Sequence, residues 1–168
     1  MTDKSKKIFF ALTIIVPILL YCFYYYGMMV KNAPYRFADF QYLRFEYGLS
    51  DSMVNKYNSK TGLYQYTTRG GKLKKVTMPL SKDNLLYLHR KAADLGFWNF
   101  PEVSKGDNTA DKNVKTLHYL IEFVYKNKTK KVLFDQNYDG DLQLKDANMR
   151  LIKEIQGVLD EQEEHLAK

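Results

Sequence analysis

One stretch constrains this chain more than any other: residues 8–30, IFFALTIIVPILLYCFYYYGMMV, contain no charged side chain. An α-helix rises ~1.5 Å per residue, so this run spans ~34 Å, slightly more than the ~30 Å hydrocarbon core of a bilayer. We therefore predict a transmembrane helix over 8–30. A short basic tail (1–7) precedes it, and a linker (31–39) leads into one folded domain (40–168).

A cleaved signal peptide and a bacterial lipoprotein signal are the alternatives to a retained anchor. Cleavage requires small residues one and three positions before the cut, and the small residue Gly27 is preceded two positions earlier by the bulky Tyr25. A lipoprotein signal requires a small residue before its cysteine, but Tyr21 precedes Cys22. The sequence favours an uncleaved anchor.

Side chains within the run fit a membrane helix. Tyrosine favours the membrane interface, and several tyrosines gather near the end of the run. A proline is tolerated in a membrane helix when its freed carbonyl finds another partner. The anchor residues that we predict are Pro17, Tyr21, Tyr24, Tyr25 and Tyr26.

Charges on the two sides of the run predict its orientation. Three lysines (Lys4, Lys6 and Lys7) precede it, whereas Lys31 is the only basic residue close behind it. Because lysine and arginine are retained on the cytoplasmic side, we expect a cytoplasmic N-terminus and an exported domain. The predicted location is a bacterial inner membrane, crossed once, with the domain in the periplasm.

Composition bounds what the domain can be. The chain has 14 Tyr and 10 Phe, enough aromatic surface for a packed core, and its single cysteine lies within the apolar run. The domain therefore has no disulfide, no cysteine metal site and no thiol nucleophile. The net charge is +7, but the basic residues are interleaved with acidic ones, so we do not expect a nucleic-acid partner.

Hydrophobic periodicity predicts an α+β domain with a mostly antiparallel sheet and two helices packed on one face. Ser81 is the expected N-cap of the first helix, and Gly96 its expected stop. Phe97, Trp98 and Phe100 should pack that helix end onto the sheet, the alternative being a ligand-binding aromatic cluster. The predicted strands are 40–49, 63–69, 72–78, 116–125 and 129–134. The predicted helices are 82–95 and 144–165, and we expect the acidic end of the second helix to fray. Residues 50–57 form either a strand or an irregular segment, and 102–115 form an exposed loop.

This order of elements, with PLS opening the first helix and GFWNFPE following it, resembles small membrane-tethered α+β envelope domains of Bacteroidota-type bacteria. The resemblance covers residues 40–160. It implies an exported, membrane-tethered domain, and it supplies no functional residue.

The strongest candidate for a chemical site is a loop with the spacing of a calcium-binding loop. Oxygen ligands occupy positions 1, 3 and 5, glycine position 6 and an acid position 12, so one tight loop can wrap an ion that needs six to eight oxygens. The alternative is an ordinary polar turn between a strand and a helix. The candidate ligands are Asp135, Asn137, Asp139, Asp141 and Asp146. Calcium is the only cofactor that we consider.

Other polar groups suggest surfaces rather than catalysis. His89, His118 and His165 are scattered, and we place His89 on a helix surface. Two lysine-rich hairpin tips either contact anionic lipid together or form a solvated rim that protects the sheet edges. The lysines of the tips are Lys72, Lys74 and Lys75 in one and Lys126, Lys128, Lys130 and Lys131 in the other.

The leading functional hypothesis is a membrane-anchored binding or accessory domain, as a subunit of a cell-envelope complex, with the membrane and another envelope protein as partners. The alternative is an immunity or inhibitor protein against a toxin or hydrolase that acts in the periplasm. A hydrolytic enzyme is the third hypothesis, but the sequence has no phosphate loop, dinucleotide fingerprint or HExxH motif, so we do not expect an enzyme.

Overall fold

The computed structural model describes residues 3–32, 35–49, 52–68, 70–106 and 116–166. The chain divides into two compact units, Met1–Arg36 and Phe37–Lys168. Each unit is described by itself below.

The first unit is a single long helix, α1 (Asp3–Asn32), with Pro17 inside it. An 18-residue window within its stretch Asp3–Met29 has a mean hydropathy of 2.2, and no residue of that window is buried within the protein. The helix is therefore long and apolar enough to span a membrane or to act as a signal anchor. It begins five residues before the apolar run because Asp3 to Lys7 are also helical.

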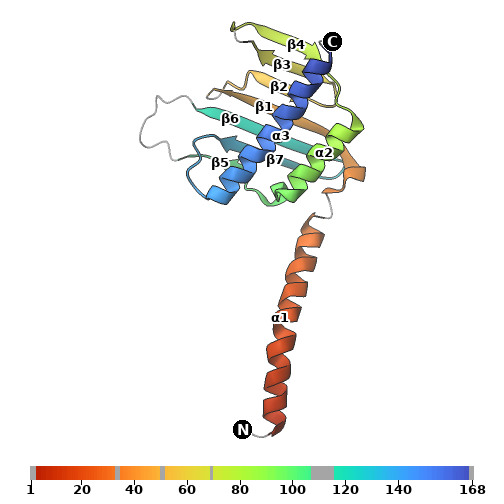
Figure 1. The fold of residues 1–168 in the computed structure, drawn as a ribbon, viewed down its shortest axis with the longest axis vertical. Helices are drawn as coiled ribbons and strands as arrows, with labels where there is room; N and C mark the ends of the chain where they lie inside the picture. Colours follow the sequence, from red (N-terminus) through yellow and green to blue (C-terminus); the bar gives the residue numbers. More distant parts are fainter. Residues whose placement is uncertain (1–2, 33–34, 50–51, 69, 107–115, 167–168) are drawn as a thin grey trace. The chain divides into compact units, whose positions relative to one another are not determined.

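The second unit is built on a seven-stranded sheet (Figure 1). Its spatial order is β4-β3-β2-β1-β6-β7-β5. All neighbouring strands are antiparallel except β5 and β7, which confirms the mostly antiparallel sheet. The strands are β1 (Phe40–Leu49), β2 (Asn55–Asn58), β3 (Leu63–Thr67), β4 (Leu73–Thr77), β5 (Val103–Ser104), β6 (Leu117–Tyr125) and β7 (Thr129–Asp135).

Two short strands refine the expectations from sequence. The undecided segment 50–57 contributes β2, which pairs along β1 from Tyr47↔Asn55 to Arg44↔Asn58. The prediction of an exposed loop over 102–115 is wrong at β5, where Ser104 is only 2% exposed. A two-residue strand has no measurable periodicity, and only its parallel pairing with β7 creates it. Residues 107–115 of that loop lie outside the described residues.

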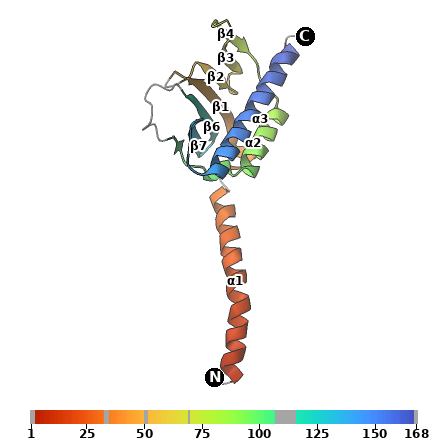
Figure 2. The same cartoon turned by 60° about the vertical axis from the view of Figure 1, so that its left-hand side comes forward.

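Two helices cover one face of the sheet, as predicted, and Figures 1 and 2 show α2 and α3 on the same side. Helix α2 (Lys82–Asp94) begins at its predicted N-cap, where the Ser81 side chain accepts a hydrogen bond from the backbone N–H of Asn84. The predicted stop is also confirmed, since Gly96 has a φ of 75°, a conformation that costs glycine little. The 3₁₀ turn η3 (Phe97–Asn99) follows.

Helix α3 (Leu142–Leu166) closes the fold. The expected fraying of its acidic end is not seen, because the helix continues to Leu166. Glu163 ties this end to the sheet: it accepts a hydrogen bond from the Tyr66 hydroxyl and lies 3.5 Å from Lys74 Nζ. These contacts offset the unfavourable placement of negative charge at a helix C-terminus.

The core lies between the two helices and the sheet. Strand residues Leu43, Phe45, Ile121, Phe123 and Phe134 and helix residues Leu88, Leu151, Ile152 and Ile155 are all fully buried or nearly so. Phe97 and Trp98 pack against Phe123, with ring centroids 5.4 and 5.3 Å apart. The expectation that these aromatic residues hold the end of α2 on the sheet is confirmed.

The placement of His89 on a helix surface is wrong. His89 is buried, and its ring lies 5.4 Å from both Phe37 and Trp98. The reason is helical spacing: His89 follows Leu85 by four residues and precedes Ala92 by three, so it shares their face of α2. The prediction failed because histidine is polar, although the position of His89 in the helix is one that faces the core.

Candidate functional site on the uncovered sheet face

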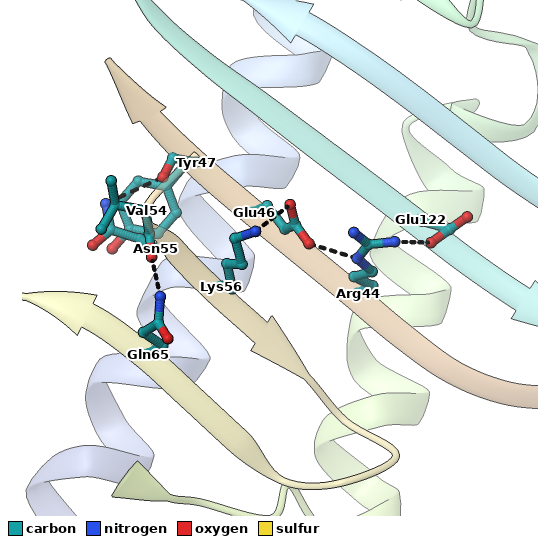
Figure 3. A network of polar contacts seen from close by, with 8 residues as sticks. All are labelled: Arg44, Glu46, Tyr47, Val54, Asn55, Lys56, Gln65 and Glu122. Carbon is teal, nitrogen blue, oxygen red and sulfur yellow. Dashed lines mark hydrogen bonds and ion pairs between the residues drawn. The ribbon is translucent and has the colours of Figure 1, made fainter. Parts of the chain in front are cut away.

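The sheet has a second face that neither α2 nor α3 covers (Figure 2). Side chains alternate along β1, so the burial of Leu43 and Phe45 under the helices sends Arg44 and Glu46 to the opposite face. Figure 3 shows these side chains in front of the sheet, with the helices behind it. This surface is called the uncovered face below.

Four charged residues from three neighbouring strands meet on the uncovered face (Figure 3). Arg44 Nε lies 2.6 Å from Glu46 Oε1, and Arg44 Nη1 lies 3.5 Å from Glu122 Oε2. Lys56 Nζ lies 3.8 Å from the second oxygen of Glu46. Strand register explains the meeting, because Arg44 pairs with Glu122 across β6, and Glu46 pairs with Lys56 across β2. We call these four residues the charge network.

The charge network is partly withdrawn from water. The Glu46 side chain is 8% exposed and that of Arg44 is 41% exposed. The hydrogen bond from Arg44 to Glu46 raises the pKa of the guanidinium, against the opposing effect of burial. Two cationic and two anionic groups balance, so the network presents fixed donors and acceptors of both signs. Such a pattern provides specificity and orientation in protein contacts.

An apolar row adjoins the charge network. Glu46 pairs with Leu120, Leu120 with Leu133, and Leu133 with Val103, so the row runs across β6, β7 and β5. Exposure increases along it: Leu120 is buried, Leu133 is half-buried and Val103 is 54% exposed. We call Leu120, Leu133 and Val103 the apolar row.

Two amide side chains hold the chain where it enters β2. Asn55 Nδ2 donates to the carbonyl oxygen of Tyr47, at 3.2 Å, and Gln65 Nε2 donates to that of Val54, at 2.9 Å (Figure 3). Nearby, Gly48 leaves room for the connection into β2, because a Cβ atom there would lie 2.1 Å from the backbone oxygen of Ser52. These contacts fix the entry into β2, and with it the position of Lys56.

The candidate calcium ligands begin at the end of β7. Asp135 is completely buried. Its Oδ1 accepts a hydrogen bond from the backbone N–H of Asn137, at 3.3 Å, while Oδ2 has no hydrogen-bond partner among the residues that the structure describes. Asn137 and Asp139 follow in the exposed part of the loop.

Of the remaining two candidate ligands, Asp141 directly precedes α3 and Asp146 lies within it. Asp141 caps the helix by accepting a hydrogen bond from the backbone N–H of Gln143, at 2.8 Å, and Asp146 lies 2.8 Å from Arg150 Nε in an ion pair. Within the described part of the chain, no group of three or more His, Cys, Asp or Glu residues is placed to hold a metal ion. Calcium binding stays a prediction.

The two lysine-rich hairpin tips lie at opposite ends of the sheet, so the hypothesis that both contact one bilayer is wrong. The β3–β4 turn lies at the end where β1 finishes, and the β6–β7 turn at the end where β1 starts. Lysines of both tips also bind within the domain: Lys74 pairs with Glu163, Lys126 pairs with Asp39, and Lys130 Nζ donates to the carbonyl oxygen of Phe100. The two tips are separated because their hairpins turn at opposite ends of the antiparallel sheet. Sequence composition carries no information about this arrangement.

Sequence reasoning missed the charge network as a unit. The alternation along 40–49 places Arg44 and Glu46 on one face, but the partner of Glu46, Lys56, lies 10 residues away in sequence, and the partner of Arg44, Glu122, lies 78 residues away. Only the register of three strands identifies those partners. No family model, no curated protein and no solved structure matches this chain.

Proposed function

We propose that this protein is a single-pass protein of a bacterial inner membrane, with a cytoplasmic N-terminus and a periplasmic domain that binds another envelope protein. The length, hydropathy and exposure of α1 support the membrane anchor. The lysines before the apolar run support the orientation. Alkaline extraction of membranes and protease protection of the C-terminal domain test these two parts; release of the chain by alkali would contradict the anchor.

One observation carries the binding role: the apolar row lies beside a charge network on the uncovered face. Protein interfaces combine an apolar centre with a polar surround. Removing aliphatic side chains at such a centre from water contributes favourable free energy to binding. Val103 and Leu133 are the accessible part of this centre. The partner that fits is a protein surface with an apolar centre flanked by charges of both signs.

Site-specific photo-crosslinking in membranes tests this role. A photoreactive residue at Leu133 should give a discrete adduct with one envelope protein, whereas the same residue at Lys153, an exposed position on α3, should not. Val103→Glu should reduce the adduct at Leu133 at least tenfold, because it places a charge in the apolar row while changing an exposed side chain. Equal adducts at both positions, or no effect of Val103→Glu, would contradict the role of the uncovered face. A toxin or hydrolase as the captured protein would support an inhibitor.

A further inference from the structure

Exposed lysines gather at one end of the domain, the end at which β1 begins. The backbone N–H of Lys126, in the β6–β7 turn, donates to the carbonyl oxygen of Asp39, at 2.9 Å, and Lys128 ends the same turn. Lys60, in the β2–β3 turn, lies over the ring of Tyr42. The start of α2 adds Lys82. We call Lys60, Lys82, Lys126 and Lys128 the basic rim.

Aromatic and aliphatic side chains lie within the basic rim. Phe37, Phe40, Leu80 and Leu85 line one shallow cavity together with Lys82. Phe37 and Phe40 stack with ring centroids 5.5 Å apart, and both are only partly buried. Lysine side chains around half-buried aromatic rings suit the boundary between lipid headgroups and acyl chains.

Chain connectivity restricts how far this end can lie from α1. Only residues 33–36 separate Asn32, the last residue of α1, from Phe37, the first residue of η2 (Phe37–Asp39). An extended chain spans at most ~3.6 Å per residue, so the five steps from Asn32 to Phe37 cover at most ~18 Å. If α1 crosses a bilayer, the end that carries the basic rim is the part of the domain that the chain keeps nearest to the headgroups.

The charge of this end suits an anionic surface. Two aspartates lie beside these lysines in the described part of the domain: Asp39 pairs with Lys126, at 3.7 Å, and Asp83 lies in the first turn of α2. Four lysines against two aspartates leave an excess of positive charge. A second copy of the same end would meet like charges, which disfavours self-association there.

We propose that the basic rim docks on anionic phospholipid headgroups of the membrane that holds α1, and thereby orients the uncovered face relative to that membrane. The proposal rests on the proposed membrane anchor. Lysines attract anionic headgroups only within about a Debye length, so docking should depend on lipid charge and on salt.

Hydrogen exchange of the full chain in nanodiscs tests this proposal. Discs of phosphatidylcholine alone are compared with discs that contain about 30% phosphatidylglycerol, an anionic fraction large enough to attract lysines. Amides of 58–62 and 126–129 should exchange at least threefold more slowly in the anionic discs, whereas those of 70–73, at the other end of the sheet, should not change. About 0.5 M NaCl should remove the difference.

Matched triple variants separate the basic rim from overall charge. Lys60→Glu/Lys82→Glu/Lys128→Glu should abolish the protection, and Lys72→Glu/Lys75→Glu/Lys153→Glu, the same charge change away from the rim, should preserve it. Tryptophan fluorescence of Trp98, the chain's single tryptophan, verifies that each variant is folded.

Equal protection in neutral and anionic discs, no protection in either, or loss of protection in the second triple variant would overturn the proposal. A chain that fails to incorporate into discs would instead refute the membrane anchor. The two failures are therefore distinguishable.

Discussion

The bond between Arg44 and Glu46 should contribute measurably to the stability of the domain. A hydrogen bond between two charged groups contributes roughly 1.5–3 kcal/mol, and exposed ion pairs contribute about 0–1 kcal/mol. The Glu46 side chain is 8% exposed and that of Arg44 is 41% exposed, so the pair lies between these cases. We expect Arg44→Met to reduce the free energy of unfolding by about 2 kcal/mol, because the withdrawn Glu46 carboxylate loses its nearest cation.

The two ends of this bond should not be equivalent. Glu46→Gln should cost about 1 kcal/mol, because the more exposed guanidinium can still bind water and Glu122. The double variant should then yield a coupling energy of about 1 kcal/mol between the two side chains. Arg44 lies farther from Glu122, at 3.5 Å, so Glu122→Gln serves as the matched control and should couple to Arg44 by less than about 0.5 kcal/mol.

Urea unfolding of the full chain in detergent micelles measures these energies. Trp98 is the single tryptophan and is buried beside Phe123, so its fluorescence reports unfolding of the domain and is insensitive to α1. A coupling below about 0.3 kcal/mol, within the usual error of additivity, would refute the argument that burial strengthens this bond. A larger coupling to Glu122 than to Glu46 would refute the assignment of the main partner.

Three further outcomes are expected. Burial raises the pKa of Tyr57 from 10.0 to about 12, so the folded state keeps the hydroxyl proton to higher pH than the unfolded state does. The free energy of unfolding should therefore fall by about 2 kcal/mol as the pH rises from 10 to 12, and thermal melting should show a shallower decline with pH in Tyr57→Phe. Gly48→Ala should lower the urea midpoint, because its Cβ would lie 2.1 Å from the backbone oxygen of Ser52. Gly157→Ala should raise the free energy of unfolding by about 0.5–1 kcal/mol, because this exposed position in α3 has no atom within 4 Å of an added Cβ. Equal effects of the two substitutions would contradict the close approach of Gly48 to Ser52. Terbium luminescence and calorimetry should detect calcium binding that Asp139→Asn weakens, and no binding at millimolar calcium would remove that prediction.

The basic rim and the uncovered face are related by the direction of β1. The basic rim lies at the end of the sheet where β1 starts, and the charge network lies on a face that runs along β1 away from that end. If the rim docks on the membrane, the uncovered face stands roughly perpendicular to the membrane surface. A neighbouring envelope protein could then reach it from the side. Failure of rim docking would leave the binding role of the uncovered face intact, because different side chains carry each.

Local sequence determined the features that depend on short-range chemistry. An uncharged run of helical length predicts α1, alternation predicts β1 and β6, and Ser81 and Gly96 mark the ends of α2. Each of these signals lies within a single helix, strand or turn, because apolar runs, capping, φ preference and side-chain alternation are all properties of continuous sequence. These signals can therefore be recognised in the sequence without any knowledge of the fold.

Tertiary structure decided the features that depend on distant partners. Strand β5 exists only because β7 lies beside it. Helical spacing places His89 on the inner face of α2, but aromatic residues of η2, β1, η3 and β6 are what enclose its ring. Glu163 holds the end of α3 through side chains on β3 and β4. Strand register brings Arg44 to Glu122 across 78 positions of sequence. These contacts arise from the order and register of seven strands, which no local pattern encodes. The surfaces on which the proposed function depends therefore became visible only in the folded domain.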